Sequence, residues 1–196
     1  MSAPYVELHC HSSFSFLDGA SSPLELATAA AELGYPALGL VDHDGIWGSM
    51  EFAVSCKGAG VRPITGTELT VSAAGRLFHL TLLVEDEAGY RNLCRLLTEA
   101  HAHTRDGQGR QAGQPSLPLE SLAGYAEGLV CLSGCARQGM VASAWAEGDL
   151  ARGTGFARRL LGFFGPDNLR IELQRPFWRH DRARNRWLSE LAASLG

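Results

Sequence analysis

Short apolar runs alternate with helix-forming stretches along this 196-residue chain, and the alternation restricts the fold more than any other feature. Six runs have the composition of strands, at residues 6–9, 37–42, 62–69, 78–84, 129–132 and 169–173. Repeated strand–helix units form a parallel sheet or a barrel, so we expect an α/β fold. In such folds the chemistry lies at the carboxyl ends of the strands.

Helices are predicted between these strands, over residues 49–57, 87–101, 136–147, 150–164 and 181–195 and over a segment from Ser22 to Gly34. Ser22 can cap that first helix, Pro23 suits its first turn, and Glu25 completes a capping box. Residues 103–118 contain few apolar side chains, which is typical of an exposed, mobile loop. We therefore expect residues 1–196 to form a single domain that carries this loop on its surface.

Composition excludes several classes of protein. Hydrophobic residues make up 45% and charged residues 19%, which is typical of a globular chain. No apolar run reaches the roughly 18 residues needed to span a bilayer, and the N-terminus lacks the pattern of a signal peptide. The five cysteines are odd in number and indicate reduced thiols. We expect a cytoplasmic protein with no membrane partner.

Charge is distributed unevenly along the chain. Residues 1–90 carry a net charge of −8 and residues 91–196 a net charge of +4. The acidic half could hold divalent cations, and the arginine-rich half could face phosphate or an acidic partner. The alternative is that arginine is the preferred cation of this sequence, since Lys57 is its only lysine. On the first interpretation, the candidate nucleic-acid-binding residues are Arg158, Arg159, Arg182 and Arg184.

Side chains that bind metals occur at five of the six predicted strands. His9 and His11 are two residues apart, so an extended backbone points both to one face. Alone, His79 has an ordinary explanation as a core histidine and Cys135 as a small buried hydrophobe. Together the residues predict a metal site, because imidazole suits Zn, Fe and Mn and a shared carboxylate can bridge two ions. The candidate ligands are His9, His11, Asp18, His43, Glu68, His79 and Cys135.

Several motifs together resemble the PHP (polymerase and histidinol phosphatase) domain. They are residues 8–12 (Leu-His-Cys-His-Ser), 16–19 (Phe-Leu-Asp-Gly), 42–45 (Asp-His-Asp-Gly), 63–68 (Pro-Ile-Thr-Gly-Thr-Glu) and 132–135 (Leu-Ser-Gly-Cys). Over its whole length the chain is similar to the N-terminal region of bacterial C-family DNA polymerases, the α subunits of DNA polymerase III. Residues 90–98, 171–175 and 181–185 are most similar to the error-prone branch, which serves damage-induced DNA synthesis.

The resemblance implies a distorted (β/α)7 barrel with up to three divalent metals, Zn, Mn or Fe rather than Mg. It implies that His9 and His11 bind one metal and that Glu68 bridges it to a second, held also by His79 and Cys135. Asp18 and His43 would help to bind a third. Asp42 and Asp44 lie next to this site, as possible catalytic groups that orient the imidazoles.

One part of the family pattern is missing. The family's last strand carries an Asp-x-His that supplies two metal ligands, and no Asp-x-His occurs in this chain. We therefore expect about six strands, with the seventh missing. The chain is either part of a longer polymerase or a separate short protein, and an unclosed barrel edge could pair with a second copy in a homodimer.

Two functions from different classes remain open. The first is a metal-dependent phosphoesterase or 3′–5′ exonuclease. The second is a structural or docking module with an incomplete metal site. The parent protein on either interpretation is a DNA-directed DNA polymerase, with DNA, the polymerase remainder or other replication and repair proteins as partners. The sequence leaves open whether the domain itself is an enzyme.

Overall fold

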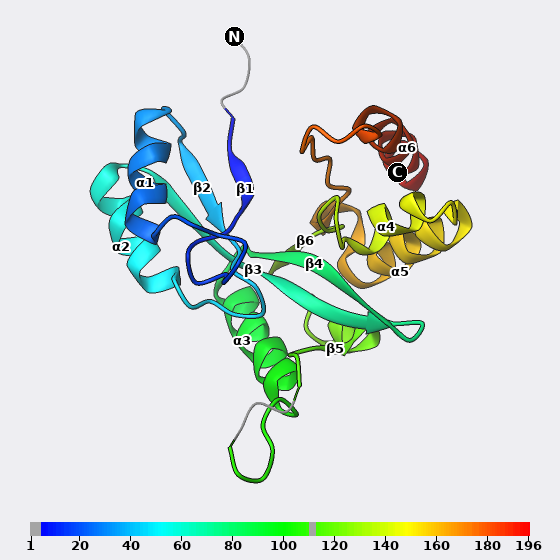
Figure 1. The fold of residues 1–196 in the computed structure, drawn as a ribbon, viewed down its shortest axis with the longest axis horizontal. Helices are drawn as coiled ribbons and strands as arrows, with labels where there is room; N and C mark the ends of the chain where they lie inside the picture. Colours follow the sequence, from blue (N-terminus) through cyan, green and yellow to red (C-terminus); the bar gives the residue numbers. More distant parts are fainter. Residues whose placement is uncertain (1–4, 110–112) are drawn as a thin grey trace. The chain divides into compact units, whose positions relative to one another are not determined.

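The computed structural model describes residues 5–109 and 113–196 of the chain, which form two compact units, Met1–Glu68 and Leu69–Gly196. Both units mix helices and strands, so the predicted α/β class is confirmed (Figure 1). No helix in the described ranges is long and apolar enough to cross a membrane. All five cysteines lie in the described ranges, and none forms a disulfide bond.

The first unit contains three parallel strands and two helices. The elements are β1 (Glu7–Cys10), α1 (Pro23–Glu32), β2 (Ala37–Leu40), α2 (Ser49–Ala59) and the first part of β3 (Arg62–Ala73). β2 pairs with β1 on one side and with β3 on the other. The predicted capping box begins α1: Ser22 Oγ accepts from the Glu25 amide, and the Glu25 carboxylate accepts from the Ser22 amide.

A small apolar core holds these elements together. Helices α1 and α2 pack against each other, and both contribute to a buried cluster with β2. The small side chains of Ala27 and Ala30 on α1 face Phe52 on α2, and all three are buried. Burial of a side chain as large as Phe52 stabilises the fold by about 2 kcal/mol. This core supports β1, β2 and β3, whose carboxyl ends carry the predicted site.

The described residues of the second unit form the rest of β3, four further strands, four α-helices and a short 3-10 helix. These are β4 (Arg76–Val84), α3 (Glu87–His101), β5 (Leu117–Pro118), η1 (Leu119–Gly124), β6 (Leu129–Leu132), α4 (Met140–Ala146), α5 (Leu150–Asn168), β7 (Leu169–Arg170) and α6 (Asp181–Leu195). β6 is antiparallel to β4 and parallel to β7. Phe78 on β4 and Phe156 on α5 meet edge to face in the core, with ring centroids 5.4 Å apart.

The expected strand–helix alternation fails between β3 and β4. A two-residue turn joins the two strands, with Ala74 at φ 50° and Gly75 at φ 73°. Positive φ at both central residues defines the tight turn that suits a hairpin, so no helix intervenes. β4 runs antiparallel to β6, so the predicted repetition of strand–helix units is wrong at this point.

Two further boundaries differ from the prediction. The loop predicted at residues 103–118 is exposed at residues 105–109, residues 110–112 lie outside the described ranges, and Leu117 is buried in β5, which pairs with β3. Helix α5 extends past the predicted end at Phe164, but it is interrupted at Gly165, where φ is 75° and ψ is 172°. The six predicted strands are all present, and β5 adds a short seventh that is not the missing barrel strand.

Candidate metal centre

Three imidazole rings converge on one buried carboxylate in the first unit. Glu68, on β3, is only 2% exposed. Its Oε1 lies 3.2 Å from Nε2 of His9, and its Oε2 lies 2.9 Å from Nδ1 of His43 and 3.6 Å from Nε2 of His11. Nε2 of His43 lies 3.0 Å from Oδ2 of Asp18. His9, His11 and Glu68 form one group that could hold an ion, and His11, Asp18 and His43 form another.

Local backbone geometry explains why these side chains meet. His9 lies on β1 and His11 follows it, and their ring centroids are 5.2 Å apart, so the prediction that both point to one face is confirmed. His43 follows β2 and pairs with Glu68 through an isolated parallel β-bridge of the backbone. In this bridge the Asp44 amide donates to the Glu68 carbonyl at 2.9 Å. This continuation of the β2–β3 pairing carries His43 to the Glu68 carboxylate.

Asp42 forms hydrogen bonds to the loop that follows His11 and not to the imidazole rings. It is 1% exposed, and its carboxylate accepts from the Ser12 amide at 2.8 Å and from the hydroxyls of Ser12 and Ser15. Ser15 Oγ in turn lies 3.3 Å from Nδ1 of His11 and accepts from the His43 amide at 3.2 Å. Asp42 therefore acts on the imidazoles through Ser15, a residue that sequence reasoning missed because an isolated serine carries no distinctive pattern.

Gly19 allows this loop to close. A Cβ on Gly19 would lie 1.9 Å from the Ser12 carbonyl oxygen, so only glycine fits there. The Gly19 amide also donates to the Ser15 carbonyl at 2.9 Å. The close approach places Asp18 next to His43.

The surroundings of His11 and His43 shift the pKa values of the two imidazoles in opposite directions. Burial lowers the pKa of His11, against the opposing effect of the Glu68 charge. The hydrogen bond to Glu68 raises the pKa of His43 to about 9, with Asp18 contributing in the same direction. The rings of His11 and His43 are stacked, with centroids 4.5 Å apart. A positive charge on one ring therefore disfavours a positive charge on the other. The imidazolium of His43 thus compensates the buried carboxylate when the cluster holds only protons.

The other two predicted ligands, His79 and Cys135, belong to the second unit. His79 lies on β4, and its amide donates to the Gln138 carbonyl at 2.9 Å. Cys135 follows β6, and its Sγ accepts from the Gln138 amide at 3.3 Å. Gly134, at φ 92°, lets this loop approach β4, because a Cβ there would lie 2.2 Å from the His79 carbonyl oxygen. The two predicted ligands therefore lie on adjoining segments of one unit.

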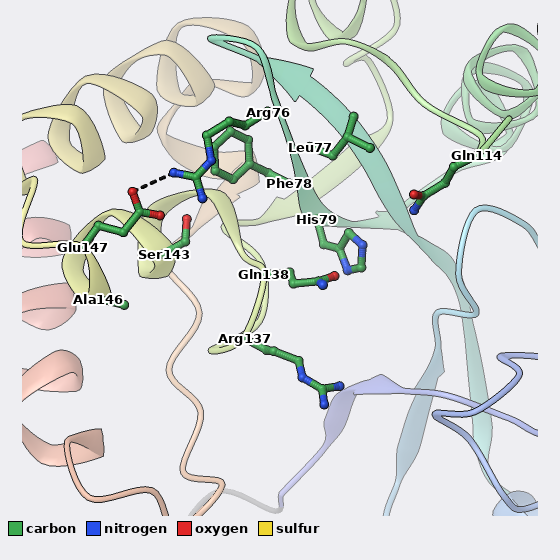
Figure 2. Close-up of a pocket in the computed structure, with 10 residues that line it drawn as sticks. All are labelled: Arg76, Leu77, Phe78, His79, Gln114, Arg137, Gln138, Ser143, Ala146 and Glu147. Atoms are coloured by element: carbon green, nitrogen blue, oxygen red, sulfur yellow. Dashed lines mark hydrogen bonds and ion pairs between the residues drawn. The ribbon is translucent and has the colours of Figure 1, made fainter.

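A polar cavity of about 330 Å³ opens beside His79 within the second unit (Figure 2). Arg76 and Glu147 form an ion pair of 2.6 Å on one wall. Arg137 also lines the cavity and forms no ion pair with any residue in the described part of the chain. The cavity is therefore lined by an imidazole and by a guanidinium that has no ion pair among the described residues.

The predicted nucleic-acid-binding arginines have different environments. Arg158 and Arg182 are exposed. Arg159 is paired with Glu120. Arg184 is only 4% exposed, and its guanidinium lies 3.0 Å from the Asp181 carboxylate and donates to the Gln174 carbonyl. The side chain of Arg184 thus holds α6 in place and is not available to a phosphate.

The protein family follows from comparison with known sequences. The PHP domain family matches residues 7–176, so the chain belongs to the PHP domain family. It is 39% identical over 98% of its length to an "Error-prone DNA polymerase" of Symbiobacterium thermophilum, and 38% identical over 97% of its length to one of Cutibacterium acnes. It is also 36% identical to a "DNA polymerase III subunit alpha" of Treponema pallidum, over 98% of its length.

The chain is much shorter than these relatives. It spans 18%, 17% and 17% of the three proteins, respectively. The chain is therefore homologous to one part of larger DNA polymerase chains. Among solved structures, a candidate metal-dependent phosphoesterase from Bifidobacterium adolescentis has a TM-score of 0.63 at 16% identity, over 99% of this chain and 85% of that one. This likeness supports the PHP-type fold.

Proposed function

We propose that the chain is the PHP portion of an error-prone DNA polymerase and that its His/Glu cluster binds divalent cations for phosphoester hydrolysis. The supporting observation is the Glu68 carboxylate, which is 2% exposed and surrounded by three imidazoles. A buried carboxylate needs compensating positive charge. Divalent cations bound by imidazole nitrogen and carboxylate oxygen would supply it.

The donor set fits such ions. The two oxygens of Glu68 face different rings, Oε1 toward His9 and Oε2 toward His11 and His43, which is the arrangement a bridging carboxylate needs. Imidazole and carboxylate favour Zn, Mn or Fe. We propose that His79 and Cys135 also bind a divalent cation, as the PHP resemblance implies.

The residues of the chain have separate tasks in this proposal. Bound cations would lower the pKa of a water molecule and neutralise charge on the phosphoryl oxygens. His9, His11 and Glu68 hold the site. Asp42 keeps the imidazole of His11 oriented through Ser15. Asp18 accepts from His43 at the more exposed side, where a phosphoester would enter.

A second candidate function is a structural module without turnover. The observation that favours it is that the cluster satisfies its own charges, since His43 bonds both Glu68 and Asp18. On this alternative the polymerase remainder is the partner, and the PHP portion stabilises or docks it. Since the named relatives are bacterial polymerases, either role would place the protein with DNA in the cytoplasm.

Hydrolysis assays with a metal-loaded protein separate the two candidates. The 196-residue chain is loaded with Zn²⁺, Mn²⁺ or Fe²⁺ and assayed on a chromogenic phosphodiester and on a 3′-labelled oligonucleotide. We expect metal-dependent turnover that Glu68→Gln abolishes and that Glu32→Gln, at an exposed position on α1, leaves unchanged. Metal binding without turnover on either substrate would favour the structural module.

A further inference from the structure

Residues 175–180 of the second unit, Arg-Pro-Phe-Trp-Arg-His, form an exposed segment of aromatic and basic side chains that the metal cluster does not use. Phe177 is 96% exposed and Trp178 is 50% exposed. Folded proteins rarely leave two neighbouring large aromatic residues in water without a partner. This pair therefore requires an explanation other than packing.

The segment is tied down at both of its ends. On its N-terminal side, the Gln174 carbonyl accepts from Arg184 at 2.7 Å and from the Asn185 side chain at 2.9 Å. On its C-terminal side, the Trp178 amide donates to the Asp181 carboxylate at 2.9 Å. The buried Asp181 and Arg184 of α6 thus hold the backbone in place. The aromatic pair is displayed by a fixed backbone, not by a loose end.

Phe177 also adopts a backbone conformation that is costly for its type. Its φ is 63°, in the left-handed region that aromatic residues rarely occupy. Such strain persists where the surrounding structure enforces it, and it is commonly associated with function. Phe177 therefore combines a strained backbone with a large apolar ring that is left in solvent.

Exposed arginines flank the aromatic pair in the sequence. Arg175 and Arg179 lie within the segment, and Arg182 and Arg186 follow on α6. All four are exposed, and none forms an ion pair with a residue of the described ranges. The acidic Asp181 is already paired with Arg184, so it does not neutralise them. The surface combines flat aromatic faces with uncompensated positive charge.

We propose that residues 175–180, together with Arg182 and Arg186, bind single-stranded nucleic acid. Bases stack on Phe177 and Trp178, and the phosphates lie against the arginines. Every base has a flat face, so this recognition tolerates any sequence, and duplex DNA, whose bases are already stacked, cannot use it. The site lies within the second unit and shares no residue with the proposed metal ligands.

Fluorescence anisotropy of the 196-residue chain with a labelled oligo-dT of about 15 nucleotides tests the proposal. EDTA in the buffer keeps the metal cluster from contributing. We expect Trp178→Ala to weaken binding about tenfold or more and Trp178→Phe to retain most of it. Phe177→Asn, which tolerates positive φ without an aromatic ring, should also weaken binding about tenfold.

The dependence on salt tests the arginines separately. For single strands, the logarithm of the binding constant falls with the logarithm of salt by about 0.7 per neutralised phosphate. Arg175→Gln/Arg179→Gln should therefore reduce the slope by about 1.4. The matched controls are Tyr90→Ala and Arg95→Gln, at exposed aromatic and basic positions on α3, and they should change neither affinity nor slope.

Three results would overturn the proposal. One is equal affinity for oligo-dT in the native chain, Trp178→Ala and Phe177→Asn, with thermal melts confirming that the variants are folded. Another is binding of duplex DNA as tightly as the single strand, with the same affinity in the native chain and in both aromatic variants. That result would mean that charge alone attracts the DNA. Failure of oligo-dT to bind at all would contradict the proposal while leaving the metal centre untouched.

Discussion

Replacing Asp42 should remove the hydrogen bonds that hold Ser12 and Ser15 in the loop after His11, and it should lower the free energy of unfolding. The carboxylate is 1% exposed and accepts from the Ser12 amide, the Ser12 hydroxyl and the Ser15 hydroxyl at distances of 2.7 to 3.0 Å. Hydrogen bonds to a charged group each contribute about 1.5–3 kcal/mol, against about 1 kcal/mol for a neutral pair. Asp42→Asn keeps Oδ1 as an acceptor but removes the charge.

We therefore expect Asp42→Asn to lower the free energy of unfolding by about 2 kcal/mol. Asp42→Ala should lower it by about 4 kcal/mol, because the buried Ser12 amide is then left without its acceptor. Ser12→Ala removes one hydroxyl that donates to the carboxylate and keeps the Ser12 amide, so it should cost about 1.5–3 kcal/mol, less than Asp42→Ala. Urea denaturation of the metal-free chain measures all three values.

Asp42→Ala should also weaken metal binding about 10- to 100-fold, since Ser15 then loses the carboxylate oxygen that fixes it beside His11. Isothermal titration with Zn²⁺ under conditions where the variant is folded measures this loss. A cost below about 1 kcal/mol for Asp42→Ala would refute the reasoning on stability. Unchanged metal affinity in a folded Asp42→Ala chain would refute the proposed role of Asp42 through Ser15.

Two more outcomes are expected from the geometry. Gly19→Ala should disrupt the ligand loop and weaken metal binding, because the added Cβ would lie 1.9 Å from the Ser12 carbonyl oxygen; an equal affinity, measured by the same titration, would contradict this. The ion pairs with Arg76 and Arg152 lower the pKa of Glu147 to about 2 from an ordinary value of 4.5. Because the pKa is lowered on folding, the stabilisation is present above pH 4.5 and is lost as the pH falls toward 2. The native chain should thus lose stability relative to Glu147→Gln in that interval of denaturation measurements, and parallel curves would show that the pair contributes nothing.

Much of the site could be predicted because its ligands follow the period of a strand or the end of one. His9 and His11 share a face because side chains alternate along β1, and His43 and Glu68 meet because β2 and β3 are parallel neighbours. The capping box at Ser22 and Glu25 is local and was predicted for the same reason. Each of these inferences needed only local backbone geometry and the principle that functional residues lie at the carboxyl ends of parallel strands.

The features that were missed depend on contacts between distant parts of the chain. The bonds from Ser12 and Ser15 to Asp42 join residues 27 to 30 positions apart, and nothing in the spacing of serines indicates them. Arg184 was predicted to contact nucleic acid from its charge alone, whereas it is buried against Asp181. The turn at Ala74 was missed because alanine rarely adopts positive φ.

The metal content of the purified 196-residue chain tests the central claim most directly. Elemental analysis after loading with Zn²⁺ and desalting should find roughly two or three equivalents per chain, and His9→Ala/His11→Ala should lose at least one of them. A variant with both His101 and His103 replaced by alanine, histidines of the second unit that are not predicted ligands, should keep the full content. A folded chain that retains no metal, or one whose metal content is unaffected by loss of His9 and His11, would contradict the account.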